Sequence, residues 1–193
     1  MNLPDLRTWL RTSIRRWRSS TDPRWADRES LLPDWHPRTT EIARLIPPNT
    51  RVLEFGAGRL NLIGCLPEGC SYTPCDLVDR GRGTIVCDLN GPELPSFAGH
   101  DVAVFSGVLE YVHDVERLIA HLSRDFPVIV ASYAVRDLNP KRRKRRMLGW
   151  VNDHSAAEIE DILARYRYRC GQKAVWQTQA LYRFEWTQAD RLG

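Results

Sequence analysis

Apolar runs of strand length recur along the chain, separated by segments whose apolar residues follow a helical period. The runs with strand character are Thr50 to Phe55, Ser71 to Cys75, Thr84 to Asp88, Asp101 to Phe105 and Pro127 to Ala131. The helical segments are Thr39 to Ile46, Leu60 to Leu66, a face formed by Val115, Leu118, Ile119 and Leu122, and a helix that opens with the capping pair Ser155 and Glu158. Strands that alternate with helices predict a parallel sheet wound by right-handed crossovers.

The end of the chain departs from this alternation. Lys173 to Thr178 and Leu181 to Trp186 are strand-like runs close enough in sequence to pair as a hairpin. Only Leu77 to Gly83 separates the second predicted strand from the third, fewer residues than a parallel crossover helix usually needs. We therefore predict an α/β fold with a doubly wound, mostly parallel sheet, a C-terminal antiparallel hairpin, and a second crossover helix that is short or missing.

The N-terminal part differs from the rest. Residues 1–35 are predicted to form a basic amphipathic extension and connector, ahead of one domain at residues 36–193. Apolar side chains recur there at helical spacing among arginines: Leu6, Trp9, Leu10, Ile14 and Trp17. Such a helix either lies on an anionic membrane surface or packs its tryptophan face on the domain.

The composition is ordinary for a globular domain, with 42% hydrophobic and 27% charged residues, and no segment has the apolar length of a membrane span or a signal peptide. We expect a cytoplasmic protein, with peripheral contact at the inner membrane surface through residues 1–18 as the alternative. The five cysteines lack a CxxC pair and a nearby histidine, so we expect reduced thiols and no metal site.

The net charge of +4 is distributed unevenly. An unbroken run of cations follows the fifth predicted strand: Lys141, Arg142, Arg143, Lys144, Arg145 and Arg146. Loops that leave the carboxyl ends of parallel strands form the rim of the ligand crevice. The run is therefore predicted to bind an anionic acceptor such as a phosphate-bearing sugar, a lipid-linked glycan or a nucleic acid, with a solvated basic loop as the alternative.

The first predicted strand reaches Glu54 and then turns through Gly56, Ala57 and Gly58. Glycine lets the backbone turn tightly and approach a ligand where a Cβ would clash. A glycine-rich turn after the first strand of an α/β unit is where mononucleotide-like ligands bind. The turn alone fits several cofactors, so the residues after it must decide between them.

Those residues follow in a definite order. Asp76 lies about 20 residues beyond the turn, followed by Cys87-Asp88-Leu89-Asn90, by Phe105-Ser106-Gly107-Val108-Leu109-Glu110-Tyr111, and by the C-terminal hairpin. Together with Glu54 to Gly58, this set resembles the class I S-adenosylmethionine-dependent methyltransferases over roughly residues 36–193. The resemblance implies S-adenosyl-L-methionine as the cofactor and methyl transfer as the activity.

The resemblance also implies the residues that hold the cofactor: Glu54, Gly56, Ala57, Gly58, Asp76, Leu77, Asp88, Leu89, Ser106 and Gly107. In such a site Glu54 helps to bind the methionine ammonium, and Asp76 accepts hydrogen bonds from the ribose hydroxyls. Asp88 faces the adenine amino group and Leu89 packs on the ring. Ser106 and Gly107 end the fourth strand, where the methyl donor and acceptor should meet.

Two residues depart from the family pattern. Leu60 stands where the family often has a third glycine, and Pro74 removes a backbone donor from what should be an interior strand. A degenerate site is therefore an alternative, in a non-catalytic adaptor that docks on a membrane or polyanion through its basic segments. A dinucleotide site is disfavoured, because Asn61 replaces the last glycine of its fingerprint.

The main prediction is methyl transfer to a small or glycan-like, anionic acceptor, with RNA left open as a partner. Methyl transfer from a sulfonium depends largely on alignment of donor and acceptor. An acceptor hydroxyl would need a base, and His113 lies just past the fourth predicted strand. His36, Tyr111 and His154 are weaker candidates for that role.

Overall fold

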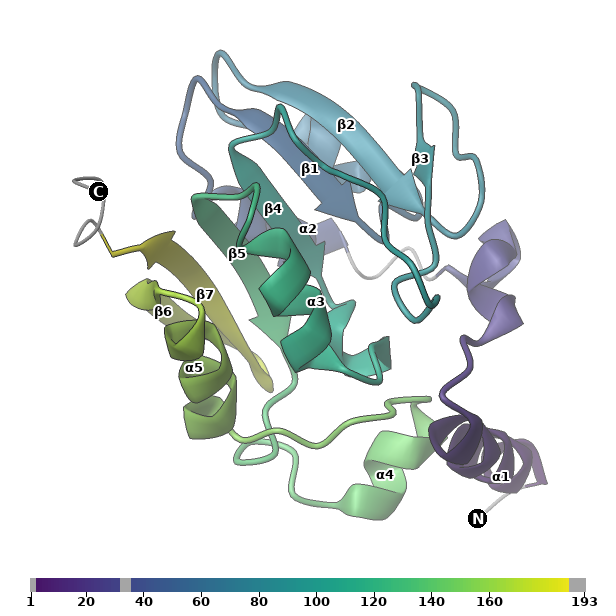
Figure 1. Ribbon diagram of the computed structural model, residues 1–193. Coiled ribbons are helices and arrows are strands. Elements are labelled where there is room, and N and C mark those ends of the chain that lie inside the picture. Colours follow the sequence, from purple (N-terminus) through teal and green to yellow (C-terminus); the bar gives the residue numbers. More distant parts are fainter. Residues whose placement is uncertain (1–2, 32–35, 188–193) are drawn as a thin grey trace.

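The computed structural model describes residues 3–31 and 36–187. The described residues form one seven-stranded sheet in the order β3-β2-β1-β4-β5-β7-β6 (Figure 1). The strands are β1 (Arg51–Phe55), β2 (Ser71–Asp76), β3 (Ile85–Val86), β4 (Val102–Ser106), β5 (Val128–Tyr133), β6 (Tyr168–Trp176) and β7 (Gln179–Trp186). All neighbours from β3 to β5 pair in parallel, and β7 pairs antiparallel with both β5 and β6. The predicted α/β fold with its C-terminal hairpin is confirmed.

Alternating side chains of the central strands build a core on each face of the sheet. Leu53, Phe55 and Phe105 belong to the larger cluster, beneath α3 (Val115–Leu122) and α5 (Ala156–Arg165). Val52 and Val104 point to the opposite face, where α2 (His36–Ala43) covers a smaller cluster. Figure 1 shows α3 and α5 in front of the sheet and α2 behind it. The two faces follow from the period-two alternation of a β-strand.

Two further helices lie at the carboxyl ends of the parallel strands, outside the sheet. They are α1 (Leu3–Arg18) and α4 (Arg142–Met147), which contact each other (Figure 1). Between α1 and α2 the chain forms two short 3-10 turns, Pro23–Ala26 and Arg28–Ser30. The Asp22 side chain caps the first turn by accepting from Arg24 N, and the Asp27 side chain caps the second by accepting from Glu29 N. This brings the N-terminal segment to the edge of the sheet where ligands bind in α/β folds.

Several element boundaries differ from the predictions. The expected helix after the glycine turn is only a 3-10 turn, Asn61–Gly64, and the third strand is reduced to two residues. No helix separates β2 from β3 among the described residues, in agreement with the short interval in the sequence. The capping box predicted at Ser155 and Glu158 is present, with both reciprocal hydrogen bonds formed.

Pro74 fits within β2 because β3 begins opposite the next residue, Cys75. The carbonyl of Cys75 accepts from Ala57 N of the β1 turn, whereas the carbonyl of Asp76 accepts from Cys87 N on the other side. Consecutive residues of a parallel strand therefore bond to opposite neighbouring strands. Pro74, two residues before Asp76, faces the β3 side as Asp76 does. Since β3 pairs only with Cys75 and Asp76, no strand stands opposite Pro74 and no ladder hydrogen bond is lost.

Candidate cofactor site

The glycine turn has the backbone geometry that its sequence predicted. Gly56 and Gly58 adopt φ values of 65° and 53°, in the left-handed region that favours glycine. A Cβ at Gly56 would also collide with the side chain of Val108. Leu60 also has a left-handed backbone, with φ of 61°, although it is not a glycine. Gly58, Arg59 and Asn61 line the pocket, but Leu60 does not. The missing third glycine therefore leaves the shape of the pocket intact.

This turn forms one wall of a pocket at the carboxyl ends of β1, β2 and β4. Every residue that the resemblance assigned to the cofactor contributes to its lining: Glu54, Gly56, Ala57, Gly58, Asp76, Leu77, Asp88, Leu89, Ser106 and Gly107. They come from strands far apart in the sequence, and the parallel register brings their ends together. Their joint placement makes the pocket a candidate for a nucleoside-sized ligand.

Glu54 is a buried carboxyl with an altered acidity. Its side chain is 3% exposed, and burial raises its pKa to about 8. The Tyr72 hydroxyl donates to Glu54 Oε2 at 2.5 Å and opposes this rise, whereas the nearby Asp76 adds to it. A cationic ligand group beside Glu54 would favour the ionised form, so the site is suited to an ammonium.

Asp76 organises the turn by its own hydrogen bonds. Its Oδ2 accepts from Gly58 N at 2.8 Å and its Oδ1 from Leu77 N at 2.7 Å. Arg80 Nη2 lies 3.1 Å from Oδ1 in an ion pair whose side chains are 7% and 6% exposed. The same guanidinium donates to the carbonyls of Trp25 and Ala26 in the N-terminal segment. Asp76 thus links the glycine turn to the segment that precedes α2.

The N-terminal segment also contacts the predicted adenine end of the pocket. Thr21 Oγ1 donates to Asp88 Oδ1 at 2.6 Å and accepts from Asn90 Nδ2 at 2.9 Å. Thr21 and Trp25 line the pocket together with Leu89. Residues of the predicted connector therefore form part of the pocket wall, although the predicted boundary at residue 35 stays a prediction.

The end of β4 is covered by a residue that the sequence analysis missed. Arg38 of α2 donates from Nη2 to the carbonyl of Ser106 at 2.9 Å, and its guanidinium lies where a Cβ of Gly107 would be. Burial lowers the pKa of Arg38, while Glu110 and Glu54 act in the opposite direction. Sequence offered no signal for it, because a lone arginine at the start of a helix is usually a solvated residue.

The positions of the base candidates do not favour His113. Its ring Nε2 lies 3.1 Å from the carbonyl of Ser20, and the residue lines a separate polar cavity together with His154. Neither histidine belongs to the lining of the cofactor pocket, and His36 is exposed at the start of α2. Tyr111 does line the pocket, and burial raises its pKa to about 12.

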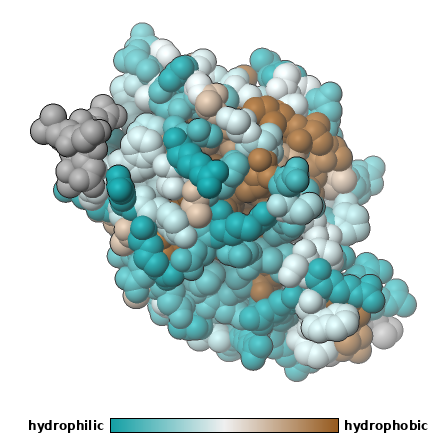
Figure 2. Space-filling model, in the orientation of Figure 1, coloured by the Kyte–Doolittle hydropathy of each residue, from teal (hydrophilic) through white to brown (hydrophobic). Residues whose placement is uncertain are grey.

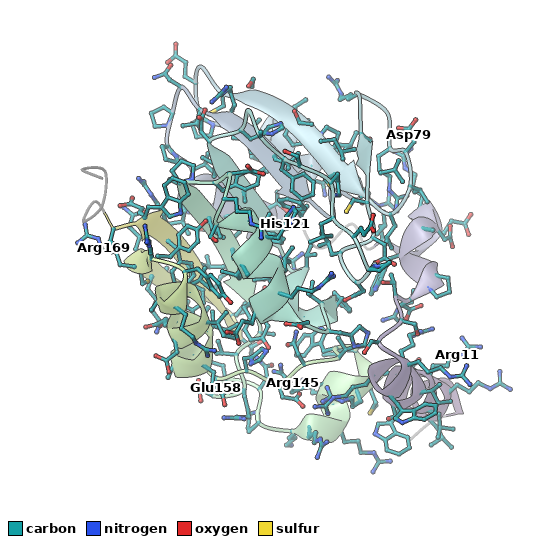
Figure 3. All side chains as sticks on the ribbon, in the orientation of Figure 1. Arg11, Asp79, His121, Arg145, Glu158 and Arg169 are labelled. Atoms are coloured by element: carbon teal, nitrogen blue, oxygen red, sulfur yellow. The ribbon has the colours of Figure 1, made fainter. Side chains whose placement is uncertain are left out.

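The basic run requires a correction. It forms α4 rather than a loop, and Arg145 and Arg146 are 1% and 3% exposed. Arg145 donates to the carbonyl of Ala134 at 2.6 Å, Arg146 donates to that of Trp150 at 2.6 Å, and both guanidinium groups pair with Asp153. In Figure 3 Arg145 lies inside the fold, whereas Arg11 extends away from α1. Buried guanidinium groups need internal partners, so the burial and pairing of these two arginines do not favour direct binding of an anionic acceptor, which stays a prediction. The remaining members are exposed: Lys141, Arg142, Arg143 and Lys144.

The chain is similar to known proteins in its fold but not in its sequence. No family model and no curated protein sequence matches the chain. Among solved structures, a Nostoc punctiforme protein described as a candidate O-methyltransferase aligns with a TM-score of 0.70 and 13% identity, over 95% of this chain and 69% of that one. Burkholderia thailandensis 1,6-didemethyltoxoflavin-N1-methyltransferase, with 1,6-didemethyltoxoflavin and S-adenosylhomocysteine bound, aligns with a TM-score of 0.60 and 16% identity, over 86% of this chain and 82% of that one. CalO1, a methyltransferase in calicheamicin biosynthesis with S-adenosylhomocysteine bound, aligns with a TM-score of 0.62 and 16% identity, over 79% of this chain and 54% of that one.

The chain therefore has the fold of the class I S-adenosylmethionine-dependent methyltransferases. It spans about half the length of several of the matching structures. Within the part of the chain that the structure describes, no cluster of histidine, cysteine or acidic residues could hold a metal ion. Over the same residues, no helix combines the length and apolarity needed to cross a bilayer.

Proposed function

We propose that the protein binds S-adenosyl-L-methionine and transfers its methyl group to a small-molecule acceptor. The observation that carries this proposal is the convergence of Glu54, Asp76 and Asp88 around the Gly56–Gly58 turn in one pocket. The three carboxyl groups match the three polar parts of the cofactor: ammonium, ribose hydroxyls and adenine amino group. Arg38, at the Ser106 end of the pocket, adds a guanidinium suited to the methionine carboxylate.

The structures similar in fold support the same activity. Bound S-adenosylhomocysteine or S-adenosylmethionine is present in the structures of CalO1, the didemethyltoxoflavin N1-methyltransferase and the O-methyltransferase NcsB1. Bound S-adenosylmethionine would supply an electrophilic methyl group. The chain itself holds and orients the ligand through the glycine turn and the carboxyl groups, and covers it with the segment that contains Thr21 and Trp25.

Isothermal titration calorimetry with S-adenosylhomocysteine tests this proposal. Asp76→Ala removes the proposed acceptor of the ribose hydroxyls, and hydrogen bonds to a charged group contribute about 1.5–3 kcal/mol each. We expect Asp76→Ala to weaken binding by roughly 10- to 150-fold, whereas Asp161→Ala, an exposed position on α5, leaves it unchanged. Failure of the folded wild-type chain to bind S-adenosylhomocysteine would overturn the proposed function.

We further propose that the acceptor is anionic. Arg24 and Arg38 line a second cavity beside the cofactor pocket, and Lys141 to Lys144 are exposed on and just before α4, the helix that ends at this cavity. The O-methyltransferase NcsB1, which is similar in fold, binds 2-hydroxy-5-methyl naphthoic acid, a carboxylic acid. Positive groups in the cavity wall and on α4 would draw an anionic acceptor toward this side of the protein by long-range attraction.

A second proposal concerns α1, which we infer to dock on an anionic membrane surface. Leu6, Leu10, Ile14 and Trp17 form one stripe along the helix and are 36%, 46%, 52% and 82% exposed, while Thr12 on the opposite face is fully buried. Figure 2 shows hydrophobic atoms at the end of the molecule where α1 lies. Exposed arginines of α1 accompany the stripe: Arg7, Arg11 and Arg18. The neighbouring helix α4 adds the exposed cations Arg142, Arg143 and Lys144. An apolar stripe bordered by cations is typical of helices that lie in the interface of anionic bilayers.

Vesicle sedimentation tests this docking. We expect the protein to bind vesicles of phosphatidylcholine and phosphatidylglycerol, and to bind pure phosphatidylcholine far less. The double variant Ile14→Ala, Trp17→Ala should lose most of this binding, whereas Val175→Ala, an exposed apolar residue of β6, should keep it. Equal binding to both vesicle types, or a dimer in solution that the double variant dissociates, would contradict membrane docking.

A further inference from the structure

A second cavity adjoins the cofactor pocket at the end of β4. The two cavities share Trp25, Arg38, Gly107 and Tyr111 in their linings, and the second extends to Glu110. Gly107 and the Arg38 guanidinium packed against it line both cavities, so ligands in the two cavities would come closest at these residues. This is the place where a methyl acceptor could reach a methyl donor.

Aromatic rings form much of the wall of this cavity. The rings of Trp25 and Tyr111 pack edge to face with centroids 4.8 Å apart, and Trp150 lines the cavity from the segment after α4. Met147 and Leu148 add apolar surface. Aromatic rings in a cavity wall favour an aromatic occupant, because ring faces and edges attract each other.

Glu110 lines this cavity and has one carboxylate oxygen without a donor. The residue is 1% exposed, and its Oε1 accepts from Ala134 N at 2.8 Å. Its Oε2 is buried and has no hydrogen-bond partner among the residues that the structure describes. The main chain holds the residue in place, since its carbonyl accepts from Val151 N at 2.8 Å. A buried acceptor without a donor is costly, so a ligand that brings a donor to Oε2 would relieve that cost.

The surroundings of Glu110 also make it a stronger base. Burial raises its pKa, and the backbone donors together with Arg38 and Arg145 only partly oppose this. A carboxylate of raised pKa accepts a proton more readily. A phenolic hydroxyl, with an ordinary pKa of about 10, is within reach of such a base.

We propose that this second cavity binds the methyl acceptor, that the acceptor is an aromatic molecule bearing a hydroxyl, and that Glu110 is the base for that hydroxyl. The proposal rests on the proposed function. The acceptor oxygen forms the bond to the methyl carbon, the electron pair of the breaking carbon–sulfur bond stays on sulfur, and the hydroxyl proton moves to Glu110 Oε2. Glu110 returns this proton to solvent after the product leaves.

Two probes that differ only in a methyl group test the proposal: p-coumarate and its methyl ether, each titrated into the full chain saturated with S-adenosylhomocysteine. We expect p-coumarate to bind at least about tenfold more tightly, because only its hydroxyl can donate to Glu110. In Glu110→Gln the amide oxygen can still accept from Ala134 N, and the ratio of the two affinities should fall to about one. Val175→Ala, at an exposed residue of β6, serves as the control and should keep the preference.

The pH dependence separates a base from a structural residue. Since the ionised form of Glu110 exists above its raised pKa, the preference for p-coumarate should grow as pH rises through that value and stay flat in Glu110→Gln. A preference that persists in Glu110→Gln, or that does not change with pH in the wild type, would overturn the role of Glu110. Absence of binding by both probes, when S-adenosylhomocysteine still binds, would overturn the acceptor site and leave the proposed function standing.

Discussion

At the scale of single residues, burial decides the chemistry of the carboxyl groups. Glu54 and Asp76 stand one strand apart in the same pocket, yet Glu54 has a raised pKa while Asp76 is held by two backbone donors and Arg80. The sequence predicted both as cofactor-binding acids. It could not predict their difference, which depends on Tyr72 and Arg80, residues from other parts of β2 and its following loop.

Glu54 should make stability depend on pH. Its folded pKa of about 8 lies above the unfolded value of about 4.3, so its contribution is fully present below the unfolded value and is lost as pH rises through the folded one. Urea unfolding should therefore show the wild type losing free energy of unfolding relative to Glu54→Gln between roughly pH 5 and 8. The exposed Glu68→Gln should follow the wild type. Parallel curves for the wild type and Glu54→Gln would show that Glu54 does not titrate in this range.

At the scale of elements, α4 shows that a run of like charges need not be one surface. The six cations were predicted to act together, but the helix turns two of them inward to Asp153 and leaves the others in solvent. Helical periodicity separates residues that are adjacent in sequence onto different faces. The partner, Asp153, comes from the loop before α5, so only the packed structure determines which arginines are internal.

Removal of an internal arginine should therefore cost far more than removal of an exposed lysine. Arg146→Ala leaves the carbonyl of Trp150 without its donor and Asp153 with one partner fewer. We expect a loss of about 2 kcal/mol in the free energy of unfolding, less than for a fully buried pair because Asp153 is partly exposed. Lys144→Ala should stay within about 0.5 kcal/mol of the wild type. Urea denaturation followed by circular dichroism measures both, and equal losses would contradict an internal role for Arg146.

At the scale of the whole molecule, the N-terminal segment closes a pocket built by the sheet. Thr21 bonds to Asp88, Arg80 bonds to the carbonyls of Trp25 and Ala26, and Arg59 donates to the carbonyl of Leu31 at 2.7 Å. The same segment continues from α1, whose apolar stripe faces solvent. Cofactor binding and the position of α1 are therefore expected to be coupled through residues 20–31.

Hydrogen exchange should reveal this coupling. We expect S-adenosylhomocysteine to slow amide exchange in residues 20–31 roughly tenfold or more, because the ligand stabilises the closed arrangement. Arg80→Ala should speed exchange in the same residues without ligand, and amides of the β6–β7 hairpin should change in neither case. Unaltered exchange in residues 20–31, when calorimetry shows that the ligand binds, would rule out their part in the pocket.

The sequence by itself determined the sheet, the hairpin, the capped helix and the glycine turn with its acids, because apolar period, capping and glycine conformation are local properties. Tertiary structure alone decided the rest. It shortened the third strand, turned Arg145 and Arg146 inward, placed His113 outside the cofactor pocket, and brought Arg38, Thr21 and Glu110 to the cavities. Those outcomes depend on contacts between residues distant in the chain, which no local pattern encodes.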